Sequence, residues 1–362
     1  MKNILLHSWV ASLFFIPVFA FASVTVTPAA GGSAISADTT GGSYTSLGTI
    51  TITEGDKKDF PKNQTSKTLI LTAPSGFSFN TAQSAPSVTF TATRDILSAS
   101  AAVTSSSTVT VTFSTDNGNN GEDALDTMVI GSSTPIQIRP AAGTPLASGQ
   151  LYQSTANGGT AAAIVGITTT NTASGSGATN FGTLTEVAGA ASALSVTPAN
   201  STITADQTAT FAATSVDQFG NSLGVVTGST TFSISGGAGG SFAANVYTPA
   251  TAGSWTVTGA KGAATGSTGL TVTPGAASTA AITASPASPV EAGSSTTLTV
   301  TVRDAHGNTV ADGTAVSFRS EGGHIQPQCT TATTATESGV CSVNWVSANP
   351  RPTVGLGGRA GR

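Results

Sequence analysis

A strand-turn-strand phrase that occurs twice constrains this chain more than any other feature of its sequence. In residues 299–303 apolar and polar residues alternate, a turn follows at residues 304–308, and the alternation resumes at Val316 and Phe318. Alternation with a period of two is typical of a half-buried strand. The phrase also occurs at residues 216–234, and the aspartates of the two copies are 87 residues apart (304 − 217). This spacing is close to the length of one small β-sandwich, about 100 residues, and predicts a tandem array of such sandwiches.

Both copies of the phrase contain a turn with the order Asp-x-x-Gly-Asn. An aspartate side chain can bind the backbone of its own turn, glycine adopts positive φ without strain, and asparagine tolerates the left-handed region. We therefore assign a structural turn role, rather than metal binding, to Asp217, Gly220, Asn221, Asp304, Gly307 and Asn308.

The composition favours an all-β fold. Charged residues make up only 8% of the chain, against about 25% in ordinary globular proteins. Such Gly- and Ser-rich chains are often disordered, but the repeated alternation of Val, Ile and Phe argues against disorder, and Thr and Val favour strands. The net charge of −4, without clusters of Lys and Arg, gives no support for nucleic-acid binding.

Residues 1–22 are predicted to be a signal peptide that is cleaved before Ser23. Lys2 supplies the positive start, a largely apolar run follows, and Ala20 and Ala22 form a small-x-small cleavage site. The alternative, an uncleaved membrane anchor, is disfavoured by the short apolar run and by the cleavage site. No later segment approaches the roughly 20 apolar residues of a membrane-spanning helix. We expect an exported protein, extracellular or at the cell surface with the periplasm as an alternative, and no transmembrane span in the mature chain.

Matching Gly-Ala-Ala-Ser phrases at residues 189–192 and 275–278 indicate boundaries between domains. After the signal peptide they divide the chain into domains at residues 23–188, 189–274 and 275–362. The first of these contains short predicted strands separated by Gly, Pro and Asp turns, which is typical of a sandwich or barrel. Its length leaves open whether it is one large sandwich or two small ones.

Several segments of the last domain match one known repeat family. They are residues 302–308, 316–318, 322–323 and the cysteine region 329–345. Through them residues 278–362 resemble the bacterial group 1 immunoglobulin-like domain, the repeat of the intimin and invasin surface proteins. Residues 190–273 look like a more divergent bacterial immunoglobulin-like domain, which keeps the Asp-x-x-Gly-Asn turn but has no cysteine. The resemblance implies tandem immunoglobulin-like β-sandwiches with a role at a cell surface.

In this family the repeat continues after the position of Trp345 through a Gly-Arg turn into at least one more strand. The residues that follow Pro350 here are mostly Gly and Arg, with few apolar side chains. A sandwich without its closing strand has an unpaired edge and a partly uncovered core. We therefore expect the domain at residues 275–362 to be incomplete at its C-terminus and to be the least stable of the three.

Cys329 and Cys341 are the two cysteines of the chain. An even pair in an exported protein predicts a disulfide, which would close a short, Thr-rich, hairpin-like loop. A metal site is the alternative, but two cysteines without a second pair of ligands nearby have poor spacing for zinc.

No arrangement of catalytic residues stands out. After the signal peptide the histidines are His306 and His324, and His306 occupies a turn position where the other copy has Phe219. The acidic clusters at residues 54–59 and 122–126 could supply the paired carboxylates of a glycosidase, but they flank turns without aromatic neighbours. We interpret them as solvated loop charges and expect no catalytic residue, no cofactor, no metal ligand and no enzymatic activity.

Two further features allow a binding function. Residues 116–127 superficially resemble a calcium loop, but the third and twelfth positions lack the required oxygen ligands, so a polar hairpin loop is favoured over an irregular calcium site. Trp255 and Trp345 lie in alternating segments, where a tryptophan belongs to a sandwich core more often than to a carbohydrate-binding surface. We favour the core for both.

Two classes of function fit these observations. The first is a secreted or cell-surface protein of the structural or adhesion type, in which the repeats act as a spacer or as a binding module for an unknown protein or glycan ligand. The alternative is a carbohydrate-binding accessory module of a secreted enzyme system. Exposed pairs of aromatic residues on one sheet face would favour the alternative, whereas polar loops favour the first class.

Overall fold

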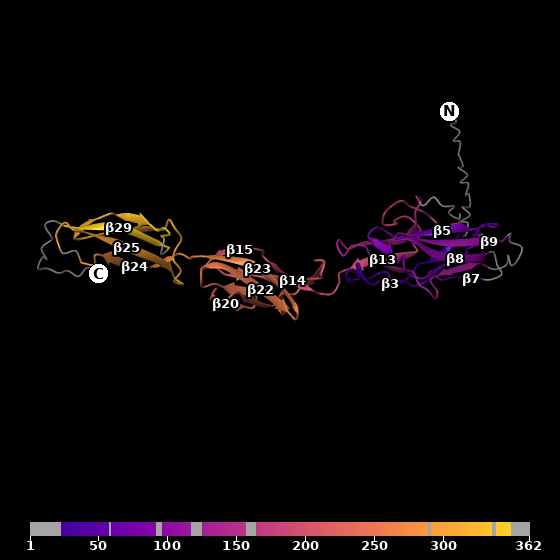
Figure 1. Cartoon of the computed structure of the whole chain (residues 1–362), viewed down its shortest axis with the longest axis horizontal. Coiled ribbons are helices and arrows are strands. Elements are labelled where there is room, and N and C mark those ends of the chain that lie inside the picture. The colour runs from indigo at the N-terminus through magenta and orange to yellow at the C-terminus, as the bar shows by residue number, and fades with distance from the viewer. Residues whose placement is uncertain are drawn as a thin grey trace, which may run out of the picture. The chain divides into compact units, whose positions relative to one another are not determined.

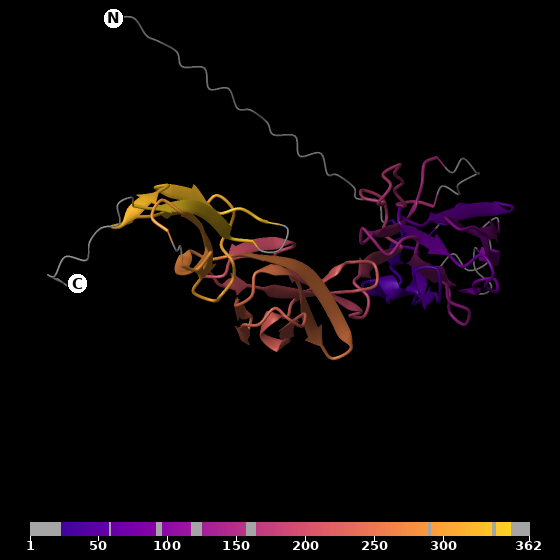
Figure 2. The ribbon, with the colours of Figure 1, turned by 60° about the vertical axis from the view of Figure 1, so that its left-hand side comes forward.

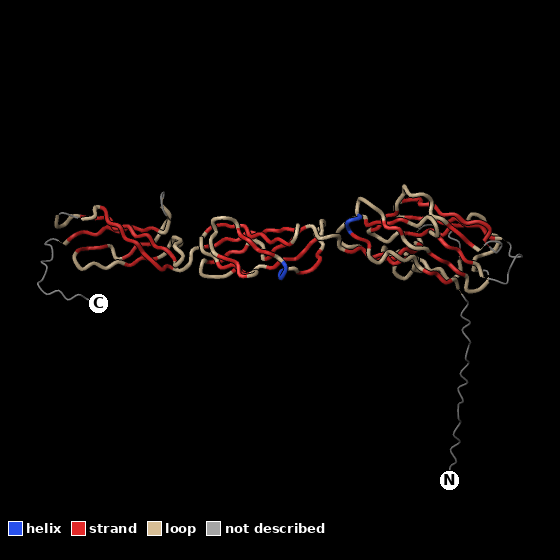
Figure 3. Tube along the Cα trace, turned by 90° about the horizontal axis from the view of Figure 1, so that it is seen from below, coloured by secondary structure: helices blue, strands red, loops and turns tan. Residues whose placement is uncertain are grey.

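The structure is a computed structural model that describes residues 23–57, 59–91, 96–116, 125–156, 164–288, 291–334 and 338–348. The predicted signal peptide, with its cleavage residues Ala20 and Ala22, lies outside the described residues. The described residues form strands, turns and two short 3-10 helices (Figure 3). No helix in this part of the chain is long and apolar enough to cross a membrane. The fold is all-β, as the sequence predicts.

The chain divides into two compact units, Met1–Gly189 and Ala190–Arg362. The first unit runs from indigo to magenta and the second from magenta through orange to yellow (Figure 1, Figure 2). The second unit has two separate clusters of buried apolar residues. We call residues 23–189 the first sandwich, residues 190–274 the second sandwich and residues 275–348 the third sandwich.

The described residues of the first sandwich form three sheets. A four-stranded sheet has the order β1 (Thr25–Thr27), β4 (Ile50–Thr53), β10 (Thr127–Ile130) and β7 (Val88–Phe90). A three-stranded sheet has the order β3 (Thr45–Ser46), β11 (Gln137–Pro140) and β6 (Phe77–Phe79). A six-stranded sheet has the order β2 (Ile35–Ser36), β13 (Gly182–Val187), β12 (Ser148–Gln153), β5 (Lys67–Thr72), β9 (Thr108–Thr115) and β8 (Ile96–Ser105), and the 3-10 helix η1 (Ala37–Thr39) follows β2.

One continuous hydrophobic cluster holds these three sheets together. Buried and half-buried residues alternate strictly along β9, so that Val109, Val111 and Phe113 all enter the core. Phe60 meets the ring of Phe113 edge to face, with ring centroids 5.8 Å apart. Because the buried cluster extends along the chain from Val24 to Leu184, a single core serves this whole region.

The second sandwich also contains three sheets. The first sheet has the order β14 (Ala193–Thr197), β17 (Ala212–Val216) and β18 (Ser222–Val225). The second has the order β15 (Ser201–Thr204), β23 (Ala264–Thr273), β22 (Gly253–Lys261) and β19 (Thr231–Ile234). The third has the order β16 (Ala209–Thr210), β21 (Val246–Thr248) and β20 (Ser241–Ala243). The 3-10 helix η2 (Thr227–Ser229) precedes β19. Strand β15 runs parallel to β23. The core is aromatic, with Phe211 and Tyr247 fully buried and Phe242 between them, its ring centroid 5.0 Å from that of Tyr247.

The third sandwich has one four-stranded sheet and one two-stranded sheet among its described residues. The larger has the order β24 (Ala277–Ser285), β25 (Ser295–Asp304), β29 (Val340–Ser347) and β27 (Gly323–Ile325), and the smaller pairs β26 (Ala315–Ser317) with β28 (Gln328–Thr330). Its buried cluster consists of Val300, Val302 and Val310, with Val316 and Phe318 packed against it. The described residues thus form a series of β-sandwiches.

Candidate functional site at the junction of the second and third sandwiches

The turn that follows β25 is held by its own side chains. Asp304 Oδ1 accepts hydrogen bonds from the backbone N–H groups of His306 and Asn308, at 2.9 and 2.8 Å. Asp304 Oδ2 accepts from Asn308 Nδ2 at 2.9 Å and from the backbone N–H of Gly275 at 2.8 Å. Gly307 has a φ of +85°, which a glycine adopts without strain. Since Asp304 is only 2% exposed, these donors take the place of water around its carboxylate.

The hydrogen bonds determine the charge state of Asp304. Burial by itself would raise the pKa of the carboxyl, because a less polar environment disfavours the charged form. The bonds from Asn308, Gly275 and His306 favour the charged form and outweigh burial, so the pKa lies below its ordinary value of 3.8. Asp304 is therefore a charged acceptor at neutral pH. Its two oxygens receive four N–H donors, and no group of three or more His, Cys, Asp or Glu among the described residues could hold a metal ion.

The turn of the second sandwich repeats this geometry. Asp217 Oδ1 accepts from the backbone N–H groups of Phe219 and Asn221, both at 2.9 Å, and Asp217 Oδ2 accepts from Asn221 Nδ2 at 2.8 Å. Gly220 has the same φ of +85°. In both turns only the glycine has positive φ. The asparagine contributes its carboxamide.

Asn308 reaches from its turn to the second sandwich. Its Nδ2 donates to the carbonyl oxygen of Ala250 at 2.9 Å, and its Oδ1 accepts from the backbone N–H of Ala252 at 2.8 Å. Both partners lie in the loop between β21 and β22. The sequence phrase gives no signal of this contact, because the partners are more than 50 residues away along the chain.

The linker between the two sandwiches is held by a carboxylate from each of them. Gly275 donates its N–H to Asp304 as described, and Ala276 donates its N–H to Asp206 Oδ2 at 2.8 Å. A Cβ on Gly275 would lie 2.4 Å from Asp206 Oδ2, so this position accepts only glycine without a rearrangement. His306 Nε2 lies 3.7 Å from Asp206 Oδ1, which adds a favourable charge interaction when the imidazole is protonated.

An open cleft of about 500 Å³ lies beside this junction and is lined by residues of both sandwiches, Asn308 among them. Several of its polar side chains bond to each other within the third sandwich. The hydroxyls of Thr309 and Ser338 are 2.6 Å apart, and the Thr333 hydroxyl donates to the carboxylate of Asp312 at 3.1 Å. These side chains stabilise the walls of the cleft.

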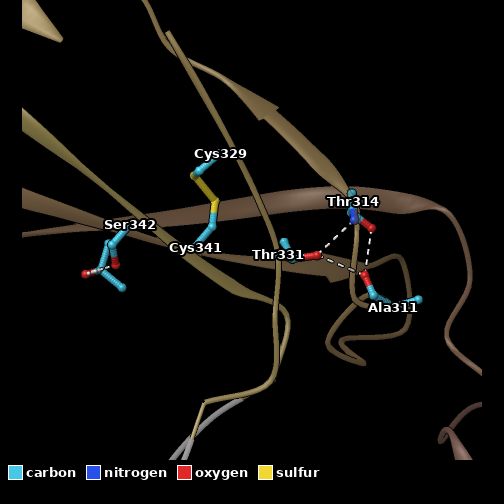
Figure 4. The surroundings of a disulfide bond; sticks show 7 residues. Ala311, Thr314, Cys329, Thr331, Cys341 and Ser342 are labelled. Carbon is cyan, nitrogen blue, oxygen red and sulfur yellow. Dashed lines mark hydrogen bonds between the residues drawn. A yellow bond between two sulfur atoms is a disulfide. The ribbon is translucent and has the colours of Figure 1, made fainter. Parts of the chain in front are cut away.

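The disulfide between Cys329 and Cys341 is present, as the sequence predicts, with the Cα atoms 6.0 Å apart (Figure 4). Besides closing a short loop, it joins β28 of the smaller sheet to β29 of the larger one. Thr331 follows β28, and its hydroxyl accepts from the Thr314 N–H at 3.0 Å and donates to the Ala311 carbonyl at 2.9 Å. The two sheets of the third sandwich are thus joined by a covalent bond close to a hydrogen-bonded loop.

The acidic residues of the first sandwich correct an interpretation made from the sequence. Glu54, Asp59 and Asp126 are not solvated, being 2%, 4% and 1% exposed. Glu54 accepts from the backbone N–H groups of Phe60 and Asp126, at 3.0 and 2.8 Å, and Asp126 Oδ2 accepts from that of Ile96 at 3.1 Å. Glu54 and Asp126 thus bind backbone groups 72 and 30 residues away, which alternation along one strand could not reveal. Glu122 and Asp123 lie outside the described residues.

The two tryptophans of the predicted strands are half-buried rather than displayed. Trp255 packs against the core of the second sandwich, and its indole N–H donates to the Thr251 carbonyl at 3.0 Å. The Trp345 indole N–H donates to the Ser320 hydroxyl at 2.8 Å. Among the described residues, the large hydrophobic side chains that are strongly exposed are all aliphatic. The structure therefore offers no pair of exposed aromatic rings in its described part.

Comparison with known proteins gives similarities at the level of solved structures. No protein-family profile and no curated protein sequence matches the chain. The Escherichia coli adhesin FdeC is 17% identical with a TM-score of 0.34, over 90% of this chain and 88% of that one. Invasin, a bacterial integrin-binding protein, is 15% identical with a TM-score of 0.32, over 90% of this chain and 55% of that one. Domains 5–6 of the S-layer protein SbsC are 21% identical with a TM-score of 0.16, over 46% and 88%. At these values the similarities carry no argument about the function of this chain.

Proposed function

We propose that this chain is an exported cell-surface protein of the structural or adhesion type, in which immunoglobulin-like sandwiches act as a spacer or as a binding module. The observation that carries the proposal is the structural role of the two Asp-x-x-Gly-Asn turns. In both, the aspartate accepts from the asparagine side chain and from backbone N–H groups. The most distinctive polar residues of the chain thus shape domains and a junction, which is what a spacer requires.

The proposal includes the division of the chain made from its sequence. Residues 1–22 are the signal peptide, and residues 23–188, 189–274 and 275–362 are successive domains. The ligand of such a protein is a protein or glycan at a cell surface. The half-buried tryptophans give the alternative, a carbohydrate-binding accessory module, no specific support, because both indole N–H groups bond within the chain.

The location can be tested on intact cells that express the chain. An antibody raised against the second sandwich should bind these cells without permeabilisation, and the first residue of the exported protein should be Ser23. Retention of residues 1–22 together with antibody binding only after lysis would contradict the proposal. A screen of the purified chain on glycan arrays and on host-cell surface proteins then separates a binding module, which gives saturable binding, from a spacer, which gives none.

A further inference from the structure

We propose that Asn308 and the linker residues Gly275 and Ala276 form a latch that makes the second and third sandwiches move as one rigid segment. The latch is a property of the fold and holds whether or not the chain is displayed on a cell surface. It is built from three parts: a carboxamide that crosses the junction, a loop shaped to receive it, and a linker whose backbone is held by two carboxylates.

The carboxamide of Asn308 has a fixed orientation. One hydrogen of Nδ2 goes to Asp304 Oδ2 and the other to the Ala250 carbonyl, while Oδ1 accepts from the Ala252 N–H. A side-chain amide has two donor hydrogens and one acceptor oxygen, and all are used here. Because Asp304 holds the amide from within its own turn, no rotamer freedom is left to be lost when the two sandwiches meet.

The receiving loop is held equally firmly by the second sandwich. Thr251 lies between the two partners of Asn308. Its carbonyl accepts from the Trp255 indole N–H at 3.0 Å, and its N–H donates to the Ala238 carbonyl at 3.0 Å. Trp255 is thus a positioning residue, which keeps the Ala250 carbonyl and the Ala252 N–H directed towards Asn308.

The backbone N–H groups of the linker are bound, unlike those of a flexible connection. Pro274 has no N–H and a fixed φ, the N–H of Gly275 binds Asp304 of the third sandwich, and the N–H of Ala276 binds Asp206 of the second. Flexible linkers are typically Gly- and Ser-rich with a solvated backbone. Gly275 instead allows the linker backbone to lie close to the Asp206 carboxylate, since a Cβ at this position would lie 2.4 Å from it.

The experiment measures the distribution of distances across the junction in the full chain. Spin labels are attached through unnatural amino acids at Lys261 and Ile282, two exposed positions in the second and third sandwiches, so that the native cysteines are not disturbed. Pulsed electron resonance then gives the distribution. The unmodified chain should show one narrow distribution, and Asn308→Ala should broaden it.

Three further variants separate the latch from the stability of the turn. Asn221→Ala removes the same bond to aspartate in the equivalent turn of the second sandwich and should leave the distribution narrow. Ala252→Pro removes the N–H that donates to Asn308 Oδ1, and its ring also fixes the φ of residue 252 and restricts Thr251. Gly275→Ala places a methyl group against Asp206. Neither variant changes a residue in the sheets of the third sandwich, and both should broaden the distribution. A broad distribution in the unmodified chain, or broadening by Asn308→Ala without broadening by Ala252→Pro, overturns the proposal.

Discussion

The second and third sandwiches carry the same turn but differ in the core attached to it. The second has a buried cluster of eleven residues that includes Phe211, Phe232 and Tyr247. The described residues of the third have a buried cluster of three valines, with Val340, Cys341 and Val343 buried outside it. Strand β14 of the second sandwich buries Leu194 and Val196, while all nine residues of β24, which occupies the corresponding place in the third, are exposed. The turn is therefore independent of how completely its sandwich is closed.

The strand β23 explains why β14 has buried residues whereas β24 is exposed. It passes so close to β14 that a Cβ on Gly266 would lie 1.9 Å from the carbonyl oxygen of Leu194, and so it covers the inner face of β14. The third sandwich has no counterpart of β22 and β23 among its described residues, and Ile282 of β24 is accordingly 61% exposed. Instead of these two strands the third sandwich has the disulfide between its sheets, which the second sandwich lacks. The comparison shows that a covalent link between sheets accompanies a small hydrophobic core.

The largest effect should come from a cavity in the larger core. Phe211→Ala removes a fully buried ring that meets Phe232 and Phe242, and we expect it to lower the free energy of unfolding of the second sandwich by about 3–5 kcal/mol. Chemical denaturation, monitored through hydrogen exchange of the backbone amides of β17 and β22, measures this loss of stability. If the loss were under about 1 kcal/mol, the aromatic cluster would not be the source of the stability of this sandwich.

The next effect should come from the disulfide. The double variant Cys329→Ser, Cys341→Ser should destabilise the third sandwich by about 2–4 kcal/mol, because the cross-link restricts the unfolded chain. With so small a core, the third sandwich of this variant should be digested first in limited proteolysis, leaving a resistant fragment that contains the second. Equal survival of both sandwiches would show that the third is closed by strands beyond those described, and would also contradict the prediction that it is the least stable domain.

A smaller effect should follow from removing a turn carboxylate. Asp304→Ala leaves four N–H donors without their acceptor, and we expect a loss of about 1–3 kcal/mol in the third sandwich. Asp304→Asn keeps an acceptor and the shape of the side chain, and it should recover part of the loss. Thermal denaturation with and without Ca²⁺ measures both. A Ca²⁺-dependent increase in Tm that disappears in Asp304→Ala would contradict the structural role of this residue.

How much of this could be predicted from the sequence depends on the distance over which each feature is determined. The all-β fold followed from alternation within single strands, and the disulfide from the count of two cysteines. The burial of Glu54 and Asp126 could not be predicted, since it depends on backbone groups up to 72 residues away. For the same reason the sequence contains no signal of the contacts of Asn308 with the loop of another sandwich. The predicted incompleteness of the last domain concerns residues beyond 348, which lie outside the described residues, and it stays a prediction.

The smallest effect should be the dependence of the third sandwich on pH. The pKa of Asp304 is lower in the folded chain than its ordinary value of 3.8, so the unfolded chain binds the proton more readily. The contribution of the Asp304 carboxylate to the free energy of unfolding is therefore complete at neutral pH. It starts to fall as the pH drops below about 4, and it is lost as the pH passes through the lower pKa of the folded chain. Asp206, His306 and Arg303 also lie at this junction, so the effect of Asp304 alone is obtained by difference from Asp304→Asn, which does not titrate. Unfolding free energies from pH 6 down to pH 3, over the range set by the ordinary carboxyl pKa, should converge for the two proteins as the pH falls. A constant difference across this range would show that the hydrogen bonds to Asp304 do not depend on its charge.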